Sequence, residues 1–429
     1  MGHQHTPHAA RSMPGARTAS RRRAGRVAVL AGLTACTAAL LPVAGATPAA
    51  ADTSAQCKFP NKSYTGRPWA LQRVLLDQLW QDTKGEGVRV AVIDTGVDVK
   101  NKQLKAAVAP SLGANFLKKT KSKNGVATER GKNDGTGDRV GHGTKVAGII
   151  AARPAAGTGF VGLAPGATII PVTQNDENGS GDVKSLARSI VHAVKKGADV
   201  INISQDTEEA IRHDSILKYA IDSALSEDIV VVASAGNDGL GGKVKRTYPA
   251  SYPGVLAVAS SDRNNERAPF SQAGEFVDVA APGVDMISTV PLGGHCADNG
   301  TSFSAPYVAG VAALLKAKHP GWTYKEITAQ IEQTAERSIA GHDILVGWGV
   351  VDPVRAVSED DHRIERPEAD EGVAKGELPT PAKLEIGETE QERNTRIGTY
   401  ALVGGGTLVA VVGGASLVYR DWRRKRSLR

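Results

Sequence analysis

Three short segments of the chain carry side chains that together suit nucleophilic catalysis. They read Val-Ile-Asp94-Thr-Gly, Gly-His142-Gly-Thr and Gly-Thr-Ser302-Phe-Ser-Ala-Pro. A serine hydroxyl attacks a carbonyl carbon when an imidazole takes its proton and a carboxylate orients the imidazole. Glycine or another small residue stands beside each of these side chains, so the backbone can turn sharply there. The segments predict acyl transfer by Ser302, with His142 as base and acid and Asp94 as the orienting carboxylate.

Each segment also has a simpler explanation. Asp94 could be a helix cap or a turn acid, and Asp98 close by is a competing carboxylate. A surface histidine at the start of a helix would leave the glycines on both sides of His142 unexplained, whereas tight packing against Asp94 and a substrate explains them. Ser304 is a rival nucleophile, but the glycine-containing turn in front of Ser302 favours Ser302.

The chain around these segments alternates between short apolar runs and helical patterns. The β-branched run at 88–93 suits a central strand of a parallel sheet, and Asp94 stands where that strand ends. Ligands of open α/β sheets bind at the carboxyl ends of strands. The alternation predicts a mainly parallel sheet covered by helices. Further strands are expected at 167–172, 199–204 and 229–233, and helices at 69–82, 181–196, 216–226 and 307–317.

A fourth segment offers a donor for a negatively charged oxygen. The expected strand at 229–233 runs into Ser234-Ala235-Gly236-Asn237. The Asn237 amide can donate to the developing oxyanion together with the backbone N–H of Ser302, which is expected at a helix N-terminus. The alternative is that Asn237 is a left-handed turn residue, because Asn-Asp-Gly is common turn chemistry. Ser234, Ala235 and Gly236 are predicted to line the substrate.

The polar stretch 111–138 reads as a long surface insertion. Its segment Asp134-Gly-Thr-Gly-Asp138 has two carboxylates, which fall short of the ligand count of a defined calcium loop. We therefore predict no metal site and no cofactor.

The positive charge of the chain lies at its two ends. The 429 residues have a net charge of +7, but residues 1–51 carry six Arg and no acid, and residues 397–429 carry six Lys or Arg and one Asp. Between them, 40 basic residues face 44 acidic ones. This distribution excludes a nucleic-acid-binding surface and indicates two membrane-targeting segments around a nearly neutral protein.

The first 51 residues have the pattern of a secretory signal peptide. A run of arginines precedes an uncharged apolar stretch at 27–41 and small residues up to Ala51. The apolar stretch is short for a retained membrane helix. Residues 52–68 then form an N-terminal extension.

An apolar segment near the C-terminus has the composition of a membrane anchor. Residues 397–419 contain no charge and would span about 35 Å as a helix, enough for a hydrocarbon core of about 30 Å. The basic tail 420–429 indicates a cytoplasmic C-terminus by the positive-inside rule. Residues 358–396 are acidic, Pro-rich and poor in aromatics, as expected of a flexible linker, although a short solvated helix at 388–393 is an alternative.

Two cysteines remain once the signal peptide, with Cys36, is removed. An even pair in an exported protein suggests a disulfide between Cys57 and Cys296. Two free thiols, or pairing with another molecule, are the alternatives.

The motifs together resemble those of subtilisin-like serine proteases. Asp94-Thr-Gly, His142-Gly-Thr-Lys-Val-Ala-Gly, Ala235-Gly-Asn237 and Gly300-Thr-Ser302-Phe-Ser-Ala-Pro carry the resemblance, which covers 69–357. It implies an α/β fold of three layers, with a mainly parallel seven-stranded sheet between helices. It also implies peptide-bond hydrolysis by Asp94, His142 and Ser302, with Asn237 as oxyanion donor.

The segments that flank residues 69–357 indicate a subgroup of this family. A signal, a short extension with a cysteine, a linker and one C-terminal membrane helix are similar to mycosins, the membrane-anchored subtilases of actinobacterial type VII secretion. The resemblance implies a single-pass enzyme outside the cell membrane that processes protein substrates and associates with the secretion complex. A structural subunit of that complex and a general cell-surface protease are the rival functions.

One segment departs from the family pattern. Where subtilases have Ser-x-Gly at the edge that pairs with the substrate, this chain has Ser204-Gln205-Asp206. The added carboxylate and the missing glycine indicate a different substrate preference.

Overall fold

The computed structural model describes residues 57–117, 131–176, 181–205, 215–241, 245–370 and 388–426. The predicted signal peptide, the first residues of the extension, Asp206 and the central part of the predicted linker lie outside these ranges.

The described residues form a seven-stranded sheet in which every neighbouring pair of strands is parallel, as predicted. The strand order is β2-β3-β1-β4-β5-β6-β7. The sheet is formed by β1 (Arg89–Asp94), β2 (Ala114–Asn115), β3 (Thr168–Thr173), β4 (Val200–Ile203), β5 (Val230–Ser234), β6 (Leu256–Ser261) and β7 (Val279–Pro282). From β1 the chain continues to β2 and β3, which lie on one side of β1, and then crosses to the other side of β1 to form β4. The carboxyl ends of β1 and β4 therefore flank the point where the strand order reverses, which is where open sheets bind ligands.

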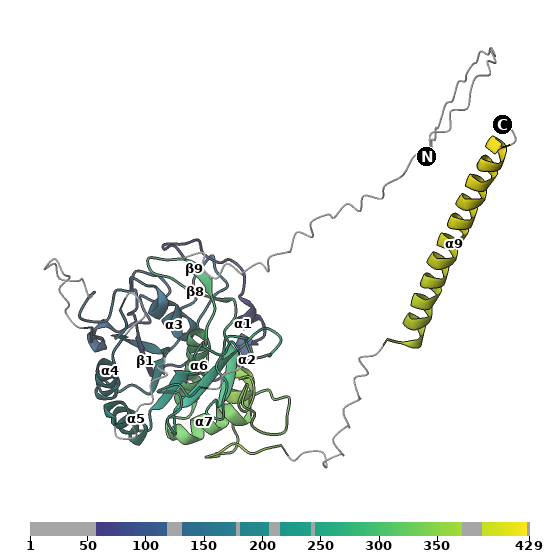
Figure 1. Ribbon diagram of the computed structural model, residues 1–429. Helices are drawn as coiled ribbons and strands as arrows, with labels where there is room; N and C mark the ends of the chain where they lie inside the picture. The colour runs from purple at the N-terminus through teal and green to yellow at the C-terminus, as the bar shows by residue number, and fades with distance from the viewer. Residues whose placement is uncertain are drawn as a thin grey trace, which may run out of the picture. The chain divides into compact units, whose positions relative to one another are not determined.

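Helices cover both faces of this sheet (Figure 1). In β1, Val90 and Val92 face one core and Ala91 and Ile93 face the other, because successive side chains of a strand point to opposite faces. The first core also contains α3 (His142–Ala151), α6 (Thr301–Lys318) and α7 (Tyr324–Gln333). The second contains α4 (Val183–Lys195) and α5 (Ile216–Ser226). The α/β class and its three layers are confirmed.

Helix α6 is longer than the apolar pattern predicted. It begins at Thr301 rather than at 307, so Ser302 lies within its first turn. Pro306 is the sixth residue of the helix, so its missing N–H removes the i→i−4 hydrogen bond to the Ser302 carbonyl. Nearly all of the helix is buried, so its polar first turn lies inside the protein beside the sheet.

The helix predicted at 69–82 is two short helices, α1 (Trp69–Gln72) and α2 (Leu76–Leu79). The two tryptophans of this segment are tied to different parts of the domain. The Trp69 indole donates to the carbonyl of Val284, and the Trp80 indole donates to the carbonyl of Leu163. The apolar periodicity was right about the burial of Leu71, Val74 and Leu79 but wrong about Leu75, which is exposed and whose non-helical backbone interrupts the helix.

The stretch 111–138 is only in part a surface insertion. After the short helix η1 (Pro110–Leu112), residues 114–115 form the edge strand β2, and Gly135 and Thr136 are buried. A methyl group on Gly135 would lie 2.2 Å from the Pro171 carbonyl oxygen, so this glycine lets the segment close onto β3. The polar composition of the stretch did not predict that residues 114–115 and 135–136, near its two ends, pack into the domain.

The N-terminal extension is fastened to a β-hairpin that leads into α6. The hairpin consists of β8 (Met286–Thr289) and β9 (His295–Asp298). The structure joins Cys57 to Cys296 of β9 by a disulfide, with 6.1 Å between their Cα atoms. Backbone bonds add to it, since Asn61 N–H donates to Gly293 and His295 N–H donates to Lys62. The extension therefore lies along the hairpin that ends just before Ser302.

Contacts with the domain continue beyond α8 (Pro353–Ser358), past the boundary expected at 357. Asp360 pairs with Lys318 and His319 at the end of α6. Farther along, the Asp370 N–H donates to the Ala340 carbonyl. Residues 359–370, which their composition assigned to the linker, are thus held by the domain.

The C-terminal helix α9 runs from Glu390 to Arg426 and includes the whole predicted span 397–419. At about 1.5 Å per residue its 37 residues extend about 55 Å. An 18-residue window within it has a mean hydropathy of 1.9, and none of its described side chains is buried. Length and composition make it able to cross a membrane. The helix also takes in the last residues of the expected linker, because Thr389 and Glu392 form a capping box ahead of the span.

The disulfide predicts a large effect on stability. It closes a separation of 239 residues, so replacing both Cys57 and Cys296 by Ser should destabilise the domain by about 2–4 kcal/mol. Thermal unfolding of the full chain in detergent, with and without reductant, measures this. Reductant should lower the melting temperature of the natural chain and leave the double variant unchanged. An equal response of the two would contradict the bond.

Candidate active site

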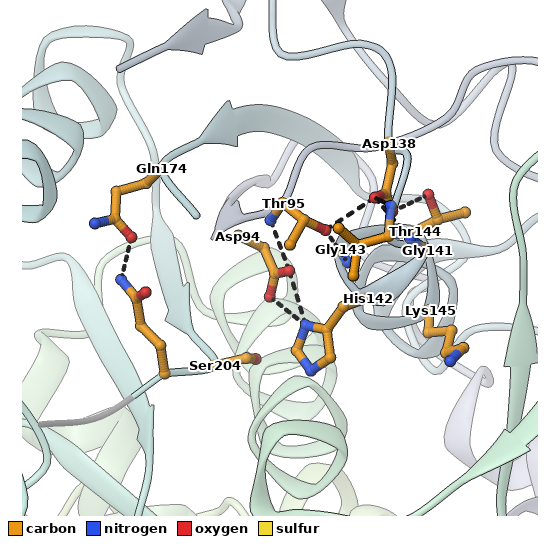
Figure 2. Close-up of polar contacts among 12 residues, drawn as sticks. Asp94, Thr95, Asp138, Gly141, His142, Gly143, Thr144, Lys145, Gln174 and Ser204 are labelled. Carbon is orange, nitrogen blue, oxygen red and sulfur yellow. Dashed lines mark hydrogen bonds and ion pairs between the residues drawn. The ribbon is translucent and has the colours of Figure 1, made fainter. Parts of the chain in front are cut away.

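The side chains of Asp94 and His142 meet at the carboxyl end of β1. The His142 Nδ1 atom lies 2.8 and 2.9 Å from the two carboxylate oxygens of Asp94 (Figure 2). Asp94 is fully buried, whereas about a quarter of the His142 side-chain surface is exposed. Because the carboxylate accepts, Nδ1 carries the proton and donates. The neutral imidazole is then left with Nε2 as a proton acceptor.

The glycines around His142 make this contact possible. A methyl group on Gly143 would lie 2.2 Å from the Gly96 carbonyl oxygen and 3.1 Å from the Asp94 Cβ atom. Gly141 precedes the helix with a φ of +86°, a left-handed conformation that favours glycine. Helix α3 can therefore approach the end of β1 closely enough for the ring of its first residue to reach Asp94.

A second carboxylate, Asp138, fixes the start of α3. Its oxygens accept from the backbone N–H groups of Val140, Gly141 and Thr144 and from the hydroxyls of Thr95 and Thr144. Thr95 in turn accepts from the Gly143 N–H, and its own N–H donates to Asp94 (Figure 2). Burial raises the pKa of Asp138, and the hydrogen bonds from Thr144 oppose that rise. In the sequence, Asp138 stands out only as a weak calcium ligand. Its position four residues before His142 could have indicated that it caps the helix that begins there.

The surroundings of His142 act on its basicity in opposite directions. Burial lowers the pKa of the imidazole, but the charge of Asp94 and the hydrogen bond to it raise the pKa by more. The resulting pKa is above the usual histidine value of 6.5. Asp94 therefore both orients the ring and makes it a stronger base.

Ser302 is the second residue of α6, behind the N-cap Gly300. In this first turn the Thr301 N–H donates to Asn237 and the Phe303 N–H donates to the Gly300 carbonyl, whereas no described residue accepts from the Ser302 N–H, which is therefore available to stabilise a negative charge. The ring of the next residue, Phe303, packs against the His142 imidazole with 5.2 Å between centroids. The described residues record no hydrogen bond between Ser302 and His142, a contact that catalytic groups often complete only with substrate.

The competing residues have other partners. Ser304 is fully buried and its hydroxyl lies 2.8 Å from that of Ser260 in β6. Asp98 accepts from the backbone N–H groups of Lys100, Asn101 and Leu292. These contacts favour Ser302 as nucleophile and Asp94 as the carboxylate.

Asn237 lies beside Ser302. Its Oδ1 atom accepts from both the backbone N–H and the hydroxyl of Thr301, 2.9 and 3.0 Å away. A backbone N–H can only donate, so the oxygen must face Thr301 and the Nδ2 donor faces the other way. A methyl group built on Gly300 would lie 3.0 Å from the Ser302 hydroxyl and 3.6 Å from this Nδ2. The hydroxyl and the amide donor are thus close to the same glycine.

The predicted substrate edge lies at the ends of β4 and β5. Ser204 is buried and accepts from the Asn202 amide, and Gln205 donates to Gln174 from the end of β3 (Figure 2). Ser234, Ala235 and Gly236 are also buried. The Gly236 N–H donates to the Thr301 hydroxyl, which ties this edge to α6. Gln174 was not singled out from the sequence, because only the tertiary structure brings β3 close to Gln205.

A further pair near the site was missed by sequence reasoning. Lys145 lies one turn after His142, and its ammonium lies 2.7 Å from an Asp298 oxygen on β9. The same ammonium stands 5.9 Å from the centre of the Phe303 ring. The pair connects the helix of the imidazole to the hairpin in front of the serine.

Comparison with known proteins gives these residues a context. The sequence profile of the subtilase family matches residues 85–349. The chain is 38% identical over 272 residues to subtilisin E of Bacillus subtilis strain 168, covering 63% of this chain and 66% of that protein. It is 38% identical over 302 residues to the thermophilic serine proteinase of Bacillus sp. strain AK1, covering 70% and 69%.

Solved structures agree with the fold. The crystal structure of MycP1 with its N-terminal propeptide removed has a TM-score of 0.60 and 34% identity, covering 68% of this chain and 97% of that one. MycP3, a protease from the type VII (ESX-3) secretion system, has a TM-score of 0.59 and 31% identity, covering 70% and 90%. With the profile spanning more than half of its length, this chain belongs to the subtilase family.

Proposed function

We propose that the protein is a serine endopeptidase that hydrolyses peptide bonds through Asp94, His142 and Ser302. The observation that carries the proposal is the hydrogen bond between buried Asp94 and His142, with Phe303 packing the imidazole beside the first turn of α6. The subtilase profile and the relatives support it.

The first step forms a covalent bond between the Ser302 oxygen and the carbonyl carbon of the substrate. The His142 Nε2 atom takes the hydroxyl proton, and Asp94 stabilises the imidazolium that results. The proton then passes to the leaving amine as the peptide bond breaks. Water, deprotonated by the same imidazole, attacks the acyl-enzyme and releases the second product.

The negative oxygen formed in each step needs donors that are already in place. Asn237 and the Ser302 N–H supply them, because the bonds of the Asn237 oxygen to Thr301 leave its amide N–H groups for the substrate. Removal of one such donor from a subtilisin oxyanion hole costs about 10²–10³-fold in kcat.

The place of action is inferred from both ends of the chain. Helix α9 can span a membrane, and its basic end carries Arg423, Arg424, Lys425 and Arg426. With a cleaved signal at 1–51, the positive-inside rule places the catalytic domain outside the membrane and the C-terminus in the cytoplasm. We propose single-pass anchoring with this orientation.

The likeness to MycP1 and MycP3, which belong to type VII secretion systems, supports a role in such a system. We propose that the enzyme processes substrates of that system and associates with its membrane complex. A mainly structural role in the complex is the second candidate, favoured by the helix α9, which is able to hold the domain at the membrane. The membrane anchor speaks against a general digestive protease.

Covalent labelling tests the nucleophile. Replacing Ser302 by Ala should abolish labelling by a fluorophosphonate probe, because the attacking oxygen is gone. Ser304→Ala is the matched control and should keep its labelling, since that hydroxyl is buried against Ser260. Circular dichroism of each variant verifies folding. Labelling that survives in Ser302→Ala and disappears in Ser304→Ala would reverse the assignment.

The pH dependence tests the role of Asp94. Hydrolysis needs neutral His142, whose pKa is raised by Asp94, so kcat/KM should fall on acidification through a pKa above 6.5. Asp94→Asn removes that charge while burial remains. The acid limb should move to lower pH, and kcat should drop about 10⁴-fold, as in other Ser-His-Asp enzymes.

Asp98→Asn is the control for this experiment. Asp98 lies four residues farther along the same segment but makes its bonds to backbone N–H groups. The acid limb should stay in place in that variant. If the two variants shifted the profile equally, His142 would not be paired with Asp94 in solution.

Complementation separates catalysis from scaffolding. A deletion strain of the source organism that carries Ser302→Ala should accumulate unprocessed substrates, visible as missing new N-termini in its secreted proteins. Secretion restored in full by Ser302→Ala, with unchanged N-termini, would instead favour the structural role.

A further inference from the structure

An open hollow of about 660 Å³ lies beside the catalytic histidine, between segments that are far apart in sequence. Phe59 of the N-terminal extension and Pro291 and Leu292 of the β8–β9 turn form its apolar walls. Gly141, the residue before His142, packs against two of these wall residues. A methyl group on Gly141 would lie 3.2 Å from the Pro291 ring and 3.3 Å from the Phe59 ring.

Three cationic residues, Lys100, Lys132 and Arg139, line the same hollow and are exposed. Within the described parts of the chain, neither Lys100 nor Lys132 forms an ion pair. Two positive charges therefore face this space without a partner from the described residues.

The two carboxylates that border the hollow are occupied from within the protein. Asp98 accepts from three backbone N–H groups, and one of them belongs to Leu292 in the hollow wall. Asp138 accepts five hydrogen bonds at the start of α3. Both side chains are more than nine-tenths buried, so their oxygens are directed into the protein and the lysines into solvent. The hollow thus has apolar walls and the exposed ammonium groups of Lys100 and Lys132.

The position of the hollow relative to His142 indicates which part of a substrate binds there. The substrate edge formed by Ser204, Gln205 and residues 234–236 lies at the ends of β4 and β5, on one side of β1. The residues that line the hollow come instead from the extension, from the β8–β9 turn and from the segments that follow β1 and precede α3. His142 gives its proton to the leaving amine, so the departing part of the substrate must lie next to this imidazole.

We propose that this hollow is a subsite for an acidic side chain on the leaving-amine side of the scissile bond, with Lys100 and Lys132 as its specificity-determining residues. The inference rests on the proposed protease function and deepens it. A Glu or Asp side chain reaches the ammonium groups while its carbons pack on Phe59 and Leu292. A carboxylate that pairs with both ammonium groups changes kcat/KM by about three- to tenfold, because each exposed charge pair contributes a factor of about 1.5 to 5.

The subsite also gives the disulfide a role in recognition. Phe59 stands two residues after Cys57, which is bonded to β9. The extension is held there by backbone bonds at Asn61 and Lys62. One apolar wall of the hollow, Phe59, therefore comes from the N-terminal extension, which is not part of the sheet or its covering helices.

A peptide library tests the proposal. The full chain in detergent is incubated with peptides randomised on both sides of the cleaved bond, and the new N-termini are identified by mass spectrometry. Asp and Glu should be enriched in the few positions after the cleaved bond. The ratio of kcat/KM for a selected peptide with Glu there to the same peptide with Gln should be about three to ten at low salt, and it should fall with ionic strength.

Variants assign the effect to the two lysines. In the double variant Lys100→Gln/Lys132→Gln the Glu-to-Gln ratio should approach one. Lys184→Gln, an exposed lysine at the start of α4, is the matched control and should keep the ratio of the natural chain.

Other outcomes overturn the inference in distinguishable ways. Cleavage without acidic enrichment, enrichment only before the cleaved bond, or a ratio unchanged in the double variant would remove the subsite and leave the protease. If no peptide were cleaved and no fluorophosphonate label incorporated, the proposed function and the subsite would fail together.

Discussion

The contact between Asp94 and His142 is the constraint to which the rest of the site is adjusted. Asp94 ends the central strand β1, and His142 begins α3, 48 residues later. A charged carboxylate in a fully buried position is costly unless hydrogen bonds satisfy it. The imidazole and the Thr95 N–H provide those bonds, so the same contact that makes His142 a better base also allows Asp94 to be buried.

The surrounding residues hold the two elements at that distance. Gly143 leaves room for the Gly96 carbonyl, Gly141 supplies a left-handed turn, and Asp138 binds the N-terminal turn of α3. A carboxylate at a helix N-terminus is also favoured by the helix dipole. The bond from Thr95 to Asp138 joins this cap to the residue next to Asp94, so helix and strand are linked by side chains as well as by packing.

The second half of the site follows from α6. This nearly all-buried helix passes under the sheet and brings its polar first turn to the ends of the strands. Thr301 accepts from Gly236 and donates to Asn237, while the Phe303 ring contacts both the His142 ring and the Lys145 ammonium. The proposed nucleophile, oxyanion donor and base thereby share one set of contacts. The extension and the hairpin pack against Gly141, the residue before His142, and line the proposed acidic subsite.

The sequence by itself determined the reaction class, the α/β fold and the identity of Asp94, His142, Ser302 and Asn237 as candidates. It could do so because these side chains stand in short local motifs and because apolar periodicity reports burial directly. Local patterns did not reveal the break between α1 and α2, the return of residues 131–138 to the sheet, or the domain contacts of residues 359–370. They also did not reveal Asp138 as a helix cap, the Gln174–Gln205 bond, or the hollow between Phe59 and Lys132. Each of these depends on groups brought together from distant parts of the chain, and only the packed tertiary structure decides which polar residues become partners and which remain exposed.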